Sequence, residues 1–118
     1  MPSLKIIIAG SWNFNDYDLL KSSIDNILCN YLEHDFEFIS GGAKGADRLG
    51  ERYAKEAGYQ PKIFKANRDE FGKQAGIFRN IQMGDYANML IAFPIGESKG
   101  THHMINYMKK LGKIVYVV

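Results

Sequence analysis

Residues 40–47 read SGGAKGAD, which places three glycines, a lysine and an aspartate between an apolar run and an amphipathic stretch. Glycine has no Cβ, so the backbone N–H groups of such a turn can approach a ligand closely. The amino end of a helix favours anions, and a phosphate or a phosphorylated sugar suits this combination. The turn lacks the GK[ST] ending of a Walker A loop, and no GxGxxG follows the first apolar run. These absences argue against an ATPase or an ordinary NAD dehydrogenase.

Other stretches of the chain offer further contacts to such a ligand. The Arg79 guanidinium can hold a phosphate through two parallel hydrogen bonds, although an arginine in mid-helix is more usually a solvated surface residue. Trp12 can stack on a base or can simply cover the core. The predicted ligand-binding residues are Gly10, Ser11, Trp12, Gly41, Gly42, Lys44, Gly45, Asp47, Arg79, Asn80, Gly96, Ser98, Gly100 and Thr101.

Three side chains in or beside these stretches are candidates for acid–base catalysis: Asp47, Glu97 and His103. A neutral imidazole can act as a general acid or base because its unperturbed pKa lies near neutrality. Each residue also has a structural interpretation. Asp47 can meet the dipole of a helix amino end, Glu97 can be solvated, and of the adjacent pair His102 and His103 one can face solvent while the other packs.

Apolar runs alternate with helical periodicity along the chain, and this order predicts the elements that position these residues. Strands are predicted over 4–9, 36–40, 61–65, 89–93 and 113–118. Helices are predicted from Asp16 to about Tyr31, from Ala46 to Ala57, over about 73–86, and from Thr101 to about Leu111. Asn15 or Asp16 is expected to cap the first helix, Gly58 to end the second, and Thr101 to cap the last. Residues 66–72 are expected to form a loop.

Five strands separated by four helices predict an α/β fold with one three-layer domain over residues 1–118, in which about five mainly parallel strands carry helices on both faces. Ligands of such sheets bind at the carboxyl ends of the strands. The loops 10–15, 41–45, 66–72 and 94–100 share that edge. Together with Gly76 they hold eight of the 12 glycines. Tight turns alone would account for any one glycine, but the accompanying polar residues favour a binding site.

Composition narrows the classes of partner. The net charge of +2 is too small to argue for nucleic acid or a membrane surface. One cysteine, Cys29, excludes an internal disulfide and a CxxC metal site. The apolar run at residues 6–9 is shorter than the core of a signal peptide. We therefore expect a cytoplasmic protein that uses no metal and no cofactor.

Four stretches together resemble one known family. GSWNF (10–14), SGGAKGADRLGERYA (40–54), FKANRDEFGKQAGIFRNIQM (64–83) and IAFPIGESKGT (91–101) occur in order over nearly the whole chain. They are similar to the YspA-like branch of the SLOG superfamily, which is related to the LOG phosphoribohydrolases and to the DprA domain. The resemblance implies a Rossmann-like fold, a nucleotide or nucleotide-derived ligand, and a homodimer or larger homo-oligomer.

Departures from the family's pattern bear on activity. The related hydrolases carry a glutamate that assists loss of the base from the ribose, and Met104 occupies the matching position here. Trp12 stands where the branch usually has an arginine, and Asn88 where an aspartate commonly precedes the fourth strand. Arg79 matches the arginine that the hydrolases share with this branch.

Three functions follow from the residues and the resemblance together. The first is a nucleotide-binding module, acting as a sensor or a sequestering protein for a phosphorylated ribose, ADP-ribose or NAD-like ligand. The second is a phosphoribohydrolase-like N-glycosidase in which Glu97 or Asp47 replaces the missing acid. The third, a single-stranded DNA binder like DprA, ranks last because the chain carries little net charge for a basic groove.

Overall fold

The computed structural model describes residues 3–118. The first two residues of the domain predicted over 1–118 lie outside the described part. Five strands form one sheet in the order β3-β2-β1-β4-β5, and each neighbouring pair is parallel. They are β1 (Ser3–Gly10), β2 (Asp35–Ser40), β3 (Lys62–Ile63), β4 (Met89–Phe93) and β5 (Ile114–Val117). The α/β prediction is confirmed, and the sheet is parallel throughout.

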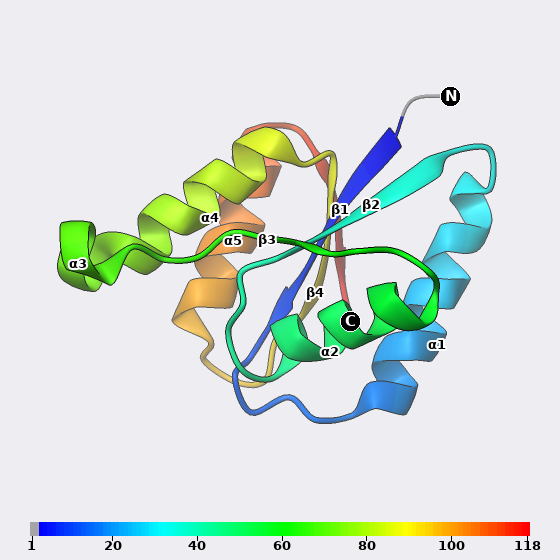
Figure 1. Ribbon diagram of the computed structural model, residues 1–118, viewed down its shortest axis with the longest axis horizontal. Helices are drawn as coiled ribbons and strands as arrows, with labels where there is room; N and C mark the ends of the chain where they lie inside the picture. The colour runs from blue at the N-terminus through cyan, green and yellow to red at the C-terminus, as the bar shows by residue number, and fades with distance from the viewer. Residues whose placement is uncertain (1–2) are drawn as a thin grey trace.

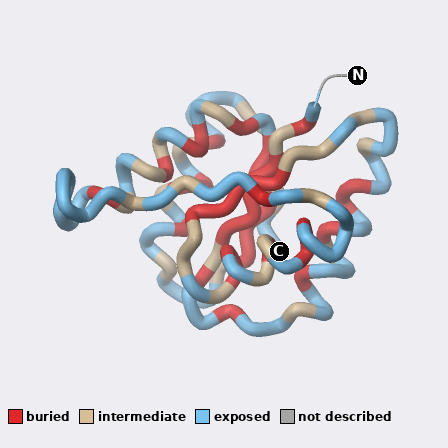
Figure 2. Tube along the Cα trace, viewed as in Figure 1, coloured by how far each residue is buried: buried red, intermediate tan, exposed pale blue. Residues whose placement is uncertain are grey.

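Helices cover both faces of the sheet, as predicted (Figure 1). One face packs against α1 (Tyr17–Leu28) and α2 (Ala46–Glu56), and the other against α4 (Ala75–Tyr86) and α5 (Lys99–Lys110). Ile6 and Ile8 of β1 enter the first core, whereas Ile7 and Ala9 enter the second. An uninterrupted apolar strand is what two covered faces require, and Figure 2 shows the buried residues gathered along the central strands.

The strand order places a topological switch beside β1. From β1 the chain moves outward through β2 to β3, and then returns to place β4 on the other side of β1. The loops that follow β1 and β4 therefore leave the sheet in opposite directions at its carboxyl edge. Crevices of this kind are where ligands bind in open α/β sheets.

The third predicted strand and the loop after it differ from the prediction. Only Lys62 and Ile63 have partners in β2. The strand begins after Pro61, which has no N–H to donate to a ladder, and β2 itself ends at Ser40. A short helix, α3 (Arg68–Phe71), stands where a loop was expected. Asn67 explains it, since its side chain accepts a hydrogen bond from Glu70 N at 3.1 Å and donates one to the Glu70 carboxylate at 3.1 Å.

Helix boundaries were predicted with mixed success. Asp16 caps α1, its Oδ1 accepting from Leu19 N at 3.0 Å, and Gly58 follows α2 with a φ of 90°. The regular helix of α1 ends at Leu28, and a 3-10 turn continues it over Cys29–Tyr31. A similar turn over Gly72–Gln74 precedes α4. The prediction that Thr101 caps the last helix is wrong. α5 begins at Lys99, so Thr101 lies inside its first turn.

Candidate functional site

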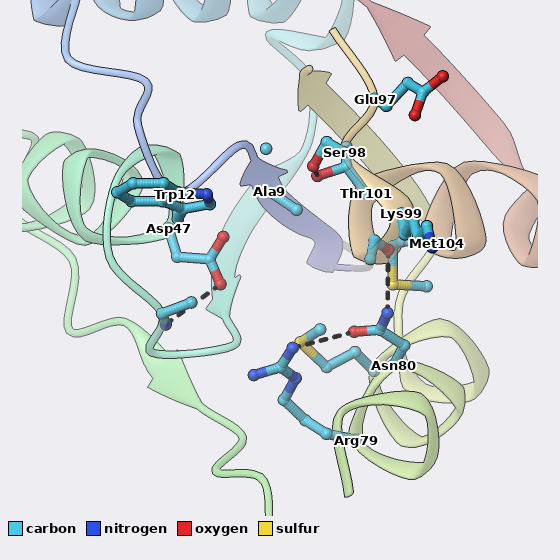
Figure 3. A pocket seen from close by; sticks show the side chains of 14 residues that line it. Ala9, Trp12, Asp47, Arg79, Asn80, Glu97, Ser98, Lys99, Thr101 and Met104 are labelled. Carbon is cyan, nitrogen blue, oxygen red and sulfur yellow. Dashed lines mark hydrogen bonds between the residues drawn. The ribbon is translucent and has the colours of Figure 1, made fainter. Parts of the chain in front are cut away.

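A pocket of about 390 Å³ lies at the carboxyl edge of the sheet, between the loops after β1, β2 and β4 and the helix α4 (Figure 3). This volume falls within the range of about 300–1,000 Å³ that is usual for small-ligand sites. We call it the main pocket. Its lining residues are Ala9, Gly10, Trp12, Ala43, Asp47, Arg79, Asn80, Met83, Glu97, Ser98, Lys99, Gly100, Thr101 and Met104.

Ser11 ties together the three loops that surround the main pocket. Its hydroxyl accepts a hydrogen bond from Ile95 N at 2.6 Å and lies 3.3 Å from Ile95 O, which links the β1 and β4 loops. Its carbonyl accepts from Ala46 N at 3.2 Å, at the start of α2. Ser11 is buried, and its hydroxyl is engaged by the backbone. Its role is therefore to hold the loops in register.

Gly45 allows the β2 loop to approach the β1 loop. Its φ is 78°, a left-handed conformation that side chains seldom adopt, and a Cβ there would lie 2.2 Å from Ser11 O. The glycine turn is thus pressed against the backbone of Ser11 and Trp12. This close approach positions the first turn of α2, which carries Asp47, beside the end of β1.

Asp47 shapes the glycine turn from within. Its Oδ2 accepts hydrogen bonds from Gly41 N at 3.1 Å and from Ala43 N at 3.4 Å. The side chain is buried, and burial raises the pKa of Asp47 to about 6, although Arg79 and the two backbone donors act in the opposite direction. The main pocket therefore contains a carboxyl group that titrates close to neutral pH. Such a group can accept hydrogen bonds from sugar hydroxyls or exchange a proton.

Arg79 reaches the glycine turn from α4. Its Nη1 donates to Gly41 O at 3.0 Å and its Nη2 to Asn80 Oδ1 at 3.4 Å, while its buried Nε has no hydrogen-bond partner within residues 3–118. Burial lowers the pKa of Arg79, Asp47 raises it, and nearby Arg68 lowers it further. A Cβ on Gly41 would lie 2.8 Å from Asp47 Oδ2 and 3.0 Å from Arg79 Cζ. Gly41 therefore leaves room for the carboxylate and the guanidinium to flank it.

The amino end of α5 forms the opposite wall of the main pocket. Ser98, at the N-cap position, makes no side-chain capping bond within the described chain, because its hydroxyl pairs with Thr101 Oγ1 at 2.7 Å. Asn80 Nδ2 donates to Gly100 O at 3.2 Å and fixes this turn against α4. The first N–H groups of α5 are therefore open to an anion, which the helix dipole also favours.

Trp12 forms the outer side of the pocket. It is 74% exposed, so it does not cover the core, whereas the neighbouring Phe14 is buried. Figure 3 shows the indole on the opposite side of the pocket from Lys99 and the start of α5. The buried side chains of Ala9, Met83 and Met104 provide the apolar part of the lining. An exposed indole beside a partly apolar pocket offers a surface on which a planar base can stack.

The structure brings many of the predicted site residues together around the main pocket. These are Gly10, Trp12, Asp47, Arg79, Asn80, Glu97, Ser98, Gly100 and Thr101. In Figure 3 the Glu97 carboxylate points away from the other labelled side chains.

Other predicted residues do not line it: Ser11, Gly41, Gly42, Lys44, Gly45, Gly96 and His103. Gly41 and Gly42 instead line a neighbouring pocket under the glycine turn, and their N–H groups are occupied by Asp47 and by Ser40 Oγ. Lys44 is exposed. The loop at 66–72 does not line the main pocket either, and α3 projects outward (Figure 1).

Five lining residues were not among the predicted ligand-binding or catalytic residues: Ala9, Ala43, Met83, Lys99 and Met104. Two of them could have been predicted from their positions in the sequence. Met83 stands four residues after Arg79 and so shares its helix face, and Lys99 is next to Ser98 at the start of α5. Ala9, Ala43 and Met104 are apolar residues whose place in a pocket follows only from the fold.

Residues 3–118 contain neither a cluster of metal ligands nor a membrane-spanning helix. No group of three or more His, Cys, Asp or Glu side chains in this part of the chain is placed to hold a metal ion. None of its helices is both long enough and apolar enough to cross a membrane.

Comparison with known proteins gives a matching family model and a related protein. A family model described as "YspA, cpYpsA-related SLOG family" matches residues 4–71, from β1 to the end of α3. The "Gene 61 protein" of Mycobacterium phage D29 is 31% identical over 117 residues, which cover 92% of this chain and 90% of that protein. None of the solved structures matches the chain.

Proposed function

The chain belongs to the YspA, cpYpsA-related SLOG family, and we propose that it binds a nucleotide-derived ligand with a phosphorylated ribose in the main pocket. One observation carries the proposal. At the topological switch, a single pocket combines the open amino end of α5 and Arg79, which suit a phosphate, with Asp47 and Trp12, which suit a nucleoside.

The two halves of such a ligand meet different chemistry in this pocket. The phosphate lies at the first turn of α5, where Lys99 and the Arg79 guanidinium add positive charge. The ribose hydroxyls donate to Asp47, whose raised pKa of about 6 still leaves it mainly ionised at neutral pH. The base stacks on Trp12. This arrangement keeps the phosphate away from the carboxylate that would repel it.

A thermal-shift panel of nucleoside monophosphates and diphosphates, NAD and ADP-ribose tests the proposal. A ligand present at 100 times its dissociation constant stabilises the folded chain by about 2.7 kcal/mol. The site is then checked with Gly100→Leu, because a Cβ at Gly100 meets no atom within 4 Å and leucine favours a helix more than glycine does. We expect this variant to fold and to lose binding, because its side chain obstructs the pocket.

Asn106→Leu is the matched control, because it adds the same side chain to an exposed position of the same helix, outside the main pocket. Equal binding by Gly100→Leu, Asn106→Leu and the unchanged chain would contradict the proposed site. The expected homodimer or larger assembly stays a prediction, which sedimentation equilibrium tests.

A second function is favoured by the pKa of Asp47. A carboxylate in contact with the pocket can stabilise positive charge on the ribose ring and take a proton from an attacking water, so that the N-glycosidic bond breaks and the base leaves. Met104 cannot do this. Release of free base from a bound nucleoside monophosphate, abolished in Asp47→Asn and retained in Glu97→Ala, would establish hydrolysis. Binding without base release would leave the chain a binding module.

A further inference from the structure

A smaller pocket adjoins the main pocket between the amino ends of α4 and α5. Its volume is about 240 Å³, and we call it the basic annex. Four of its lining residues, Arg79, Asn80, Lys99 and Gly100, also line the main pocket. The remaining lining residues are Arg68, Lys73, Gly76, Ile77 and His103. A ligand in the main pocket can therefore extend past Arg79 into the annex.

The annex concentrates positive charge without any acidic residue. Arg68, Lys73, Arg79 and Lys99 line it, and it contains no aspartate or glutamate. The whole chain carries only +2, from 15 basic and 13 acidic residues, so the 11 basic residues outside the annex leave the rest of the chain at −2. Overall charge therefore does not explain this cluster.

Within residues 3–118 none of these four cations forms an ion pair within 4.0 Å, although Asp47 lies near enough to favour the charged form of Arg79. The ion pair within 4.0 Å in residues 3–118 joins Arg52 and Glu56 on the far side of the sheet, on α2. Arg68 and Arg79 lie near enough for each to oppose the other's charge, and this repulsion contributes to the lowered pKa of Arg79. An anion bound among these four cations would relieve the repulsion between them.

The size and chemistry of the annex restrict which anion fits. About 240 Å³ lies below the usual range for a drug-sized ligand, so a phosphoryl group fits but a second nucleoside does not. The one aromatic ring that lines the annex, His103, lies parallel to Tyr107, with the ring centroids 6.4 Å apart. The annex is thus suited to a small polyanionic group and poorly suited to a base.

We propose that the basic annex binds a second, terminal phosphate, so that the ligand class is a nucleoside diphosphate rather than a nucleoside monophosphate. This inference rests on the proposed nucleotide binding in the main pocket. The first phosphate lies at the amino end of α5, and the second lies beyond it among Arg68, Lys73 and Lys99. Arg79, which lines both pockets, is placed to contact both phosphates.

Isothermal titration calorimetry with the monophosphates and diphosphates of adenosine, guanosine, cytidine and uridine, and with inorganic pyrophosphate, tests the inference. For the base that binds best, the diphosphate should bind at least about tenfold more tightly than the monophosphate, as an added charge-assisted contact warrants. The double variant Arg68→Gln/Lys73→Gln should remove this difference and leave monophosphate binding unchanged. Both residues are exposed, so the fold should tolerate the change.

Lys21→Gln, which removes an exposed charge from α1 on the other face of the sheet, is the matched control and should keep the preference. Monophosphate and diphosphate affinities within about twofold of each other, or equal weakening of both in the double variant, would overturn the inference alone. Pyrophosphate binding as tightly as the best diphosphate would also overturn it. Failure of all eight nucleotides to bind would overturn this inference, and failure of NAD and ADP-ribose to bind as well would overturn the proposed function with it.

Discussion

Replacing Asp47 with asparagine should make the stability of the chain less dependent on pH. In the folded chain the pKa of Asp47 is raised from 3.8 to about 6, chiefly because the side chain is buried. The folded state therefore holds this proton more tightly than the unfolded state does. The free energy of unfolding must then fall as the pH rises from near 3.8 through about 6, and stay reduced above that range.

The size of the effect follows from the two pKa values. A separation of about two pH units corresponds to about 3 kcal/mol, because each unit is worth about 1.36 kcal/mol. Roughly a third of this loss of stability has already occurred at about pH 4.5, because Asp47 of the unfolded chain is mostly ionised at that pH. Asparagine keeps an oxygen that accepts from Gly41 N and Ala43 N but cannot ionise. Its stability relative to the unchanged chain should therefore rise by about 2 kcal/mol between about pH 4.5 and about pH 8.

Urea unfolding of both proteins across this pH range measures the difference directly, because titrating groups that do not interact with Asp47 contribute equally to both. Glu33→Gln, at an exposed acid between α1 and β2, is a control that should show no comparable rise. A difference between Asp47→Asn and the unchanged chain that stays constant with pH would refute the reasoning. It would mean that Asp47 is as accessible to water in the folded chain as in the unfolded one.

Three further substitutions test separate parts of the site. Gly41→Ala should lower the free energy of unfolding, measured with urea, by roughly 2 kcal/mol, because the new methyl group lies 2.8 Å from Asp47 Oδ2 and 3.0 Å from Arg79 Cζ. Unchanged stability would mean that these groups do not flank Gly41. Trp12→Ala should change the free energy of unfolding by less than about 0.5 kcal/mol, because Trp12 is 74% exposed. It should weaken nucleotide binding in calorimetry by about tenfold or more through lost stacking, and undiminished affinity would place the base elsewhere. Ser11→Ala should lower the free energy of unfolding, measured with urea, by roughly 1–3 kcal/mol, because Ile95 N loses its 2.6 Å hydrogen bond. An unchanged free energy of unfolding would mean that Ser11 does not link the loops.

Much of the fold could be predicted from the sequence because its strands are buried on both faces. The run at 4–9 is apolar throughout, and 89–93 coincides with β4. β3 and α3 could not be predicted because each depends on local detail that periodicity does not record. Pro61 limits the pairing of β3, and the side chain of Asn67 starts a helix too short to repeat an apolar pattern.

The site was predicted in its location more than in the roles of its residues. Glycines and polar residues in four loops, each after a strand, indicated the carboxyl edge of the sheet. The main pocket lies there, lined by three of these loops but not by 66–72. The sequence could not show that the Ser11 hydroxyl is engaged by Ile95, or that the Gly41 and Gly42 N–H groups already have partners. Such hydrogen bonds join residues that only the tertiary structure brings together. The position of the basic annex likewise depends on α3 and the 3-10 turn before α4, which bring Arg68 and Lys73 near the start of α5.

The most direct test of the account is an amide chemical-shift map of the chain titrated with the nucleotide that binds most tightly. Binding in the main pocket predicts the largest shifts at residues 9–12, 43–47, 79–80 and 97–101, which come from separate loops and helices and meet there. Shifts centred instead on the apolar pocket beside Cys29, Phe36 and Tyr59, between α1 and β2, would contradict it.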